Sequence, residues 1–314
     1  MFLILLLPGS NWVKIGHIPS DSPYRFCQIL SCLELPMDIP LHLQNMTVSA
    51  EWLEKRRRLP YLTLEPIPLC GGCPPESVKA IEGYLDGRII VSEAAKLITA
   101  VTYNVMGVEL RYLWILLANI IVELPDDSTK AVDLVDAIRS QLSTSTTDWQ
   151  QHFTFACEWY EEYKDHLHAG LPWEEETLSK DRQVELRAVY EASGRAEAEM
   201  FLRGLPIPQW WGYKTIAMVC WGREGIDVLL SNIYPWAKVA SAALKDQLEL
   251  GKIEVHLYES YEVRRATMEE HWEHWTKKYL ELSKDGSRDP KGRILSSEGR
   301  RLAALIYHHM RERV

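Results

Sequence analysis

Apolar residues recur at intervals of three and four through residues 109–125, the most hydrophobic run of the chain. They occupy most of the circumference of a helix: Leu113, Trp114, Leu116, Leu117, Ile120, Ile121 and Leu124. A helix that is apolar on nearly every side is stable only where other elements cover it. The pattern therefore predicts a central buried helix around which the remaining helices pack.

The same period predicts further helices. A short helix over residues 76–85 should stop at Gly87, and Ser92 should cap a helix that continues to about residue 103. Amphipathic patterns predict the others at residues 130–142, 147–168, 181–203, 211–221, 226–250 (with a kink or break at Pro235), 253–283 and 297–313. In the helix 181–203, the expected apolar set is Val184, Leu186, Val189, Tyr190, Met200 and Leu202. No strand pattern bounded by turns interrupts them, so the predicted class is all-α, an irregular multi-helix bundle.

Residues 1–75 differ from the rest because they hold most of the 16 prolines. Proline removes a backbone donor and fixes φ, which favours an irregular, poorly ordered extension. One short helix is expected over residues 49–57, with Ser49 as its N-cap. Residues 76–314 should form a single large helical domain, with a subdivision near residues 170–176. Because the stretch from Met46 also reads as an ordinary protein start, residues 1–45 are either a poorly ordered extension or no part of the functional unit.

The length, composition and charge of the chain restrict the kinds of protein that it can be. The chain has 314 residues, 46% of them hydrophobic, and a formal net charge of -9. Such a composition is globular, and an acidic balance argues against nucleic acid as a partner. The apolar run 112–124 is shorter than the roughly 20 residues that cross a bilayer, so no transmembrane segment is predicted. The apolar start lacks a basic residue and ends at Pro8, so secretion is not predicted and a cytoplasmic location is expected.

Cys70 and Cys73 form a CxxC motif, the most suggestive spacing among the six cysteines. It is compatible with half of a zinc site, with a dithiol redox pair, or with two structural thiols. A zinc site needs two more ligands, for which Cys27 and Cys32 are available, but no ribbon pattern joins the two pairs. Structural thiols are the preferred interpretation.

His271 and His274 are one helical turn apart in the predicted helix 253–283, so both could reach one metal ion. The zinc-protease and di-iron motifs are missing from this helix. The alternative is a mixed helix surface with Trp272 and Trp275 facing inward, and this is preferred. We therefore assign no metal ligand, no cofactor and no catalytic residue from the sequence.

Tryptophan is frequent, with 12 residues, and clusters with tyrosine in the last third of the chain. The set could line a ligand pocket between helices, served by His271 and His274: Trp210, Trp211, Tyr213, Trp221 and Trp236. Alternatively, these large rings fill helix–helix interfaces, as aromatic residues commonly do.

A basic run, Lys55, Arg56, Arg57 and Arg58, stands out in this acidic chain. It could be a nuclear-localisation element or a phosphate contact, and nuclear import is then the alternative to the cytoplasm. The other interpretation is a solvated helix end.

Five short segments follow one another between residues 77 and 141: Ile81-Glu82-Gly83-Tyr84-Leu85-Asp86-Gly87, Ser92-Glu93-Ala94-Ala95, Leu113-Trp114, Glu123-Leu124-Pro125 and Ala131-Val132-Asp133-Leu134-Val135. Their order resembles the opening of a family of fungal all-helical proteins known as domain of unknown function 3632. The resemblance implies an intracellular fungal protein with an all-helical fold, and an accessory role in secondary metabolism. It carries no catalytic residue to this chain.

Two functions remain open. The chain has no nucleophile elbow, no phosphate-binding loop and no kinase motif. The leading hypothesis is therefore a non-enzymatic binding or interaction module for a protein or a small molecule. The alternative is an enzyme without a short motif, whose pocket would lie among the aromatic residues.

Overall fold

The computed structural model of the chain describes residues 4–6, 12–14, 50–56, 72–101, 108–141, 154–159, 179–205, 207, 209–220, 225–246, 252–257, 262–289 and 292–312. The chain divides into two compact units, which are Met1–Pro40 and Leu41–Val314. In the smaller unit, β1 (Ile4–Leu6) pairs with the antiparallel strand β2 (Trp12–Lys14). The predicted disorder of the extension, the start at Met46, the Ser49 cap and the subdivision near 170–176 lie outside the described residues.

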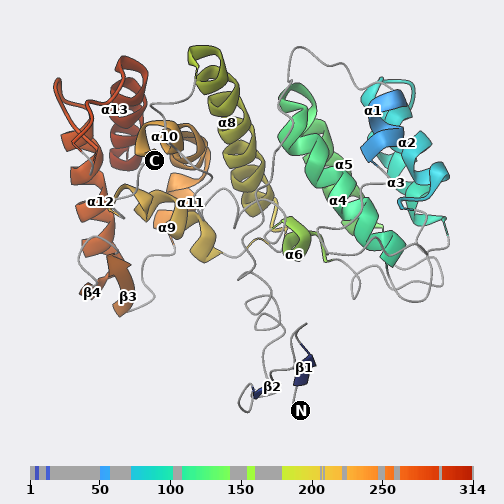
Figure 1. The fold of residues 1–314 in the computed structure, drawn as a ribbon, viewed down its shortest axis with the longest axis horizontal. Coiled ribbons are helices and arrows are strands. Elements are labelled where there is room, and N and C mark those ends of the chain that lie inside the picture. Colours follow the sequence, from blue (N-terminus) through green and yellow to red (C-terminus); the bar gives the residue numbers. More distant parts are fainter. Residues whose placement is uncertain are drawn as a thin grey trace. The chain divides into compact units, whose positions relative to one another are not determined.

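The larger unit is all-α apart from one hairpin and one isolated bridge among its described residues (Figure 1). Its first helices are α1 (Ala50–Arg56), α2 (Pro75–Leu85), α3 (Val91–Thr99), α4 (Val108–Glu123), α5 (Ser128–Ser140) and α6 (Phe155–Trp159). A short 3-10 turn over Pro125–Asp127 joins α4 to α5. These bounds confirm the helices predicted at 49–57, 76–85, 109–125 and 130–142. The predicted helix 147–168 is described only at α6.

Helix α3 begins differently from the prediction. Its N-cap is Ile90, in extended backbone and without a side-chain cap, and Ser92 lies inside the first turn. The predicted Ser92 cap is therefore wrong. Gly87 has a φ of 72°, a left-handed conformation that glycine adopts without steric cost, and it ends α2 as predicted.

Helix α4 is the buried centre of the first helices. Leu113, Trp114, Leu117 and Ile121 are fully buried, and α5, α6 and α8 all pack against this helix. The Trp114 ring meets Phe155 of α6 edge to face, with ring centroids 6.0 Å apart. The prediction of a central helix covered on all sides is confirmed.

Helix α8 (Lys180–Leu202) contacts helices that precede it in the sequence and a helix that follows it. It packs against α4 and α5, and also against α10 (Ile226–Pro235). At the α8–α10 crossing the backbones come so close that a Cβ on Gly194 would lie 2.1 Å from the carbonyl oxygen of Asn232. Only glycine fits there.

The apolar set predicted for α8 is correct in its middle and wrong at its ends. The side chains of Leu186, Val189, Tyr190 and Met200 are buried. Val184 is 66% exposed and Leu202 is 46% exposed. Both lie near helix ends, where no described neighbour covers them, so the period alone overestimates the buried face.

The last helices follow α8 along the chain. They are α9 (Gln209–Ala217), a 3-10 turn over Met218–Cys220, α10, a π-helical turn over Trp236–Ala240, α11 (Ser241–Lys245), α12 (Met268–Leu282) and α13 (Ser297–Arg311). The prediction of a kink or break at Pro235 is confirmed as a local distortion, because the chain stays helical but widens into the π turn directly after the proline, which offers no backbone N–H.

The single helix predicted over 253–283 is wrong. Residues Lys252–Leu257 form β3, which pairs antiparallel with β4 (Glu262–Thr267), with Ile253 opposite Ala266 and Val255 opposite Arg264. The helix begins only at Met268, because Thr267 and Glu270 form a capping box. The alternation of Ile253, Val255 and Leu257 is the strand signal that the helical interpretation overlooked.

Hydrogen bonds among polar side chains link the start of α13 to α8 and α10. Asp227 of α10 accepts hydrogen bonds from the backbone N–H and the hydroxyl of Ser296, at 3.2 and 2.9 Å. Ser296 is the N-cap of α13. Arg187 of α8 donates to the other carboxylate oxygen of Asp227 at 2.6 Å.

Within the described part of the chain, no helix is long and apolar enough to cross a membrane.

Candidate functional site

The structure buries, wholly or in part, the described residues that were expected to line an aromatic pocket. Trp211 and Trp236 are buried, and Tyr213 is half-buried. The side chain of Trp210 and all of Trp221 lie outside the described residues. The described members therefore belong to the interior rather than to an open surface.

Trp236 fills the space that a pocket would need. Its ring lies 5.7 Å from the ring of Phe201, and a Cβ on Gly212 would come within 2.7 Å of it. Tyr213 donates its hydroxyl to the carbonyl of Leu244 at 2.8 Å. These contacts close α9, α11 and the π turn against one another, so the rings act here as core.

A buried carboxylate organises this closed region. Glu197 of α8 is 2% exposed and accepts a hydrogen bond from the indole N–H of Trp159 at 2.8 Å. Its other oxygen accepts from the indole N–H of Trp236 at 3.1 Å. One side chain thus joins α6, α8 and the π turn, because a buried carboxylate is stable only where donors surround it.

His271 and His274 lie in different environments on α12. His271 is fully buried and stacks on the ring of Trp275, with centroids 5.8 Å apart, whereas His274 is half-buried. Across the described ranges, no three His, Cys, Asp or Glu side chains gather as metal ligands. Cys73 is buried, and its CxxC partner Cys70 lies outside the described residues, as do Cys27 and Cys32.

Arg56 shows where the basic run touches the fold. Its guanidinium lies 2.5 Å from a carboxylate oxygen of Glu123, and both side chains are about one-tenth exposed. The indole N–H of Trp52 donates to the same oxygen at 3.2 Å. Arg56 is therefore a buried contact between α1 and α4 rather than part of a solvated helix end. Arg57, Arg58 and the side chain of Lys55 lie outside the described residues.

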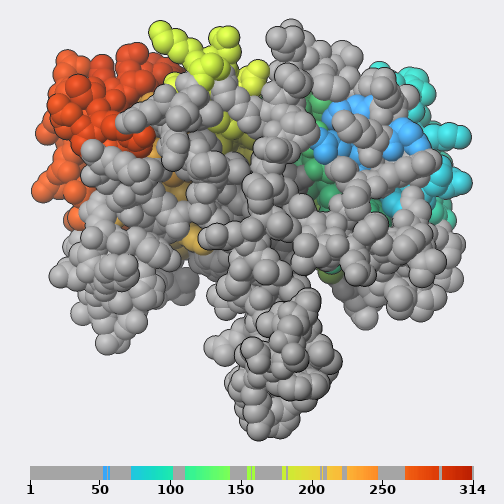
Figure 2. Space-filling model, viewed as in Figure 1, coloured from blue at the N-terminus to red at the C-terminus, as the bar shows by residue number. Residues whose placement is uncertain are grey.

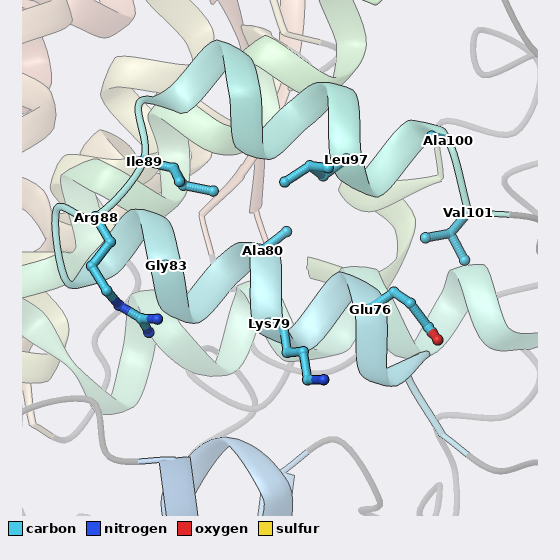
Figure 3. Close-up of a pocket in the computed structure, with 9 residues that line it drawn as sticks. All are labelled: Glu76, Lys79, Ala80, Gly83, Arg88, Ile89, Leu97, Ala100 and Val101. Carbon is cyan, nitrogen blue, oxygen red and sulfur yellow. The ribbon is translucent and has the colours of Figure 1, made fainter.

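An open groove of about 570 Å³ lies elsewhere, between α2 and α3 (Figure 3). Its apolar lining comes from Ala80 and Gly83 of α2, Ile89 of the connecting turn, and Leu97, Ala100 and Val101 of α3 and the residues after it. Leu97 is 48% exposed although it is a large aliphatic residue. Atoms of α2 and α3, cyan in Figure 2, lie at the surface of the molecule.

Helical spacing explains how the groove forms. Ala80 and Gly83 share one face of α2 with Glu76 and Lys79, since residues three and four apart lie on the same side. Leu97, Ala100 and Val101 share a face in the same way. Small side chains at Ala80, Gly83 and Ala100 leave a trough where large ones would have filled the space between the helices.

Among the described lining residues, the charged ones lie on the α2 side of the groove. Figure 3 shows Arg88, Lys79 and Glu76 along that side and the apolar side chains of Ile89, Leu97 and Val101 opposite them. Arg88 lies 2.9 Å from Asp86 and 3.3 Å from Glu82. Glu76 and Lys79 make no ion pair with any residue that the structure describes.

Tyr84, on another face of α2, has altered acidity. Burial, with Asp133 of α5 nearby, raises the pKa of Tyr84 to about 12.

Sequence reasoning missed this groove. The available signal was the pair of small residues Ala80 and Gly83 one turn apart, on a face that a packed helix would fill with larger side chains. The tryptophans are the stronger sequence signal, because aromatic residues are common in ligand pockets.

No family model, no curated protein and no solved structure matches the chain.

Proposed function

We propose that the protein is a non-enzymatic interaction module, which binds an apolar segment of a partner protein in the groove between α2 and α3. The observation that carries this proposal is the open, aliphatic-lined groove, with Leu97 left half-exposed. Exposed apolar surface rimmed by polar residues is characteristic of binding sites. Covering Leu97 and Ile89 with a partner's apolar side chains removes that surface from water.

The enzyme alternative loses the support it had. It required a cavity among the aromatic residues, with a buried histidine or carboxylate directed into it. His271 is stacked on Trp275, and Glu197 is held by two indoles in a packed interior. The described lining of the groove between α2 and α3 has exposed charges at its rim and no buried titratable side chain.

A protein segment suits the groove better than a small molecule. Small-molecule sites usually enclose most of the ligand surface. This groove is open along two helices, so it would leave a small ligand in contact with water over much of its surface. A partner chain can cover the opening with its own backbone and flanking residues.

Peptide display tests the proposal without assuming the partner. A random peptide library is selected against the whole protein, and the enriched peptides are measured by fluorescence polarisation. We expect their affinity to fall at least about tenfold on Leu97→Arg, since a charge in an apolar contact costs more than about 1.4 kcal/mol. The matched control is Leu280→Arg on α12, because Leu280 is also a partly exposed leucine, at 37%, and does not line the groove. If no peptide is enriched, or if both variants bind equally, the proposal is wrong.

We further propose the accessory role in fungal secondary metabolism that the family resemblance implies, and a cytoplasmic location. The residues that carry the resemblance lie on α2, the Gly87 turn, α3, α4 and α5. Deletion of the gene in the source organism, followed by metabolite profiling, tests the role. An unchanged profile under conditions that express the protein would contradict it. A fluorescent fusion tests the location.

A further inference from the structure

From the groove's shape and charges, we infer that the partner segment is an amphipathic helix with an acidic and a basic side chain one turn apart on the flank facing α2. This inference rests on the proposed function. It specifies the partner's secondary structure and the charges that it presents at the groove.

The walls of the groove favour a helix over an extended strand. A strand-like peptide gains affinity from backbone hydrogen bonds to an exposed sheet edge. Neither α2 nor α3 offers such an edge, because the backbone groups in a helix interior are already paired. Two adjacent helices instead present ridges and a trough into which a third helix packs through its own side chains.

Small residues at the bottom of the trough determine what enters it. Ala80 and Gly83 lie one turn apart on α2, opposite Leu97 of α3 (Figure 3). Large aliphatic side chains of a partner helix, spaced three and four residues apart, would fill the space above these small residues. The partner's apolar stripe therefore lies against the groove, and its flanks lie over the two rims.

The two rims differ in charge, which orients the partner. The α3 rim is apolar, whereas the α2 rim carries Glu76 and Lys79, which make no ion pair with described residues. Arg88 is compensated by Asp86 and Glu82. The unmatched charges are thus one negative and one positive group, three residues apart on one helix face.

The spacing of these charges matches a helix. Residues three or four apart on a helix have Cβ atoms about 5–6 Å apart. A partner helix with a basic and an acidic residue one turn apart can therefore place the base beside Glu76 and the acid beside Lys79 at the same time. A partner with two charges of one sign would have one favourable and one unfavourable contact.

Four labelled peptides test the inference. Each is an amphipathic helix of about 16 residues, long enough to cover α2, with leucines three and four apart. They differ only in one flank pair, which is Glu/Lys, Glu/Glu, Lys/Lys or Gln/Gln. By fluorescence polarisation, we expect Glu/Lys to bind most tightly. The advantage should be roughly two- to five-fold for each matched exposed pair, and it should shrink at high salt.

Charge reversal in the protein should then change which peptide binds best. Lys79→Glu makes the rim doubly negative, so Lys/Lys should become the tightest peptide. Glu76→Lys makes it doubly positive, so Glu/Glu should. A gain of affinity for a new peptide cannot come from a variant that fails to fold. The matched controls are Lys277→Glu and Glu273→Lys on α12, since both side chains are exposed and α12 does not line the groove. These should leave the ranking unchanged.

The outcomes separate the two proposals. Equal affinities of the four peptides, all lost on Leu97→Arg, would overturn the charge inference and leave the groove as the binding site. Failure of all four, with display peptides that still depend on Leu97, would overturn the helical partner. Failure of both assays would overturn the proposed function itself.

Discussion

The interior around Trp236 and the groove between α2 and α3 are built from side chains of opposite size. Around Trp236, large rings and a buried glutamate occupy the volume between helices, and no room remains even for a methyl group on Gly212. Between α2 and α3, alanines and a glycine leave a trough of about 570 Å³. The comparison shows that an open site here comes from small residues between helices and not from an abundance of aromatic ones.

The largest expected effect is complete unfolding in alkali, driven by the closed interior. Burial raises the pKa of the Tyr279 and Tyr190 phenols well above 10, so the fold holds both in the neutral form. Their contribution to stability is complete below pH 10, the unfolded value, and declines as the pH rises towards the folded value. Tyr84, on the groove helix α2, is only partly buried, and its pKa is raised to about 12.

Phenolate absorbance and helical circular dichroism, followed together above pH 9, check this difference between the regions. We expect the signal of the buried tyrosines to appear only as the helical signal disappears. Ionisation of all tyrosines near pH 10 with intact helices would show that Tyr279 is not enclosed as the structure has it.

Trp236→Ala should cause the next largest loss. The ring is fully buried and its N–H donates to Glu197, so the free energy of unfolding should fall by about 3–5 kcal/mol. Trp236→Phe keeps most of the ring and removes the donor, for a loss of about 1–3 kcal/mol. Urea denaturation measures both. A loss below about 1 kcal/mol for the alanine variant would contradict a closed core.

Gly212→Ala tests the closed region with one methyl group. Its Cβ would lie 2.7 Å from the Trp236 ring and 3.0 Å from Leu244. Overpacking should cost about 1–3 kcal/mol of unfolding free energy, although alanine favours the helix. Thermal denaturation of the Gly212→Ala variant and of the unchanged protein shows whether the variant is less or more stable. A stabilised variant would show that the rings can move apart.

Gly83→Ala is the matched change beside the groove and should have the opposite sign. The nearest atoms to its Cβ belong to the Ile89 side chain, at 3.4 Å, so a methyl group fits. Alanine should then stabilise α2 by about 0.5–1 kcal/mol through helix propensity. The same denaturation experiment gives the answer. Equal losses for the two glycine variants would remove the distinction between a filled and an open region.

Much of the fold follows from local pattern. Helix α4 is predictable because its apolar residues surround the whole helix, and α2 because Pro75 and Gly87 bound it. The β3–β4 hairpin was missed because Ile253, Val255 and Leu257 alternate for only six residues beside a strongly helical stretch. The capping box at Thr267 was the sign that the helix starts later.

The candidate site could not be predicted in the same way. Whether Trp236 lines a cavity or closes one depends on which helices meet it, and sequence period does not determine that pairing. Ala80 and Gly83 look like ordinary helix residues until α3 lies beside them without filling the trough. Residue types indicate which chemistry a site could have, but tertiary packing determines where in the fold the site lies.

The hydrogen bonds that fix α13 also affect how the chain folds as it is made. Asp227 forms hydrogen bonds with both Arg187 and Ser296, which are 109 residues apart in the sequence. Domains fold as the chain emerges from the ribosome, N-terminal part first. The face of α8 that contacts α4 and α5 can therefore pack early, whereas the face that contacts α10 waits for later synthesis. During that interval the apolar surface of α8 that later packs against α10 stays exposed to water.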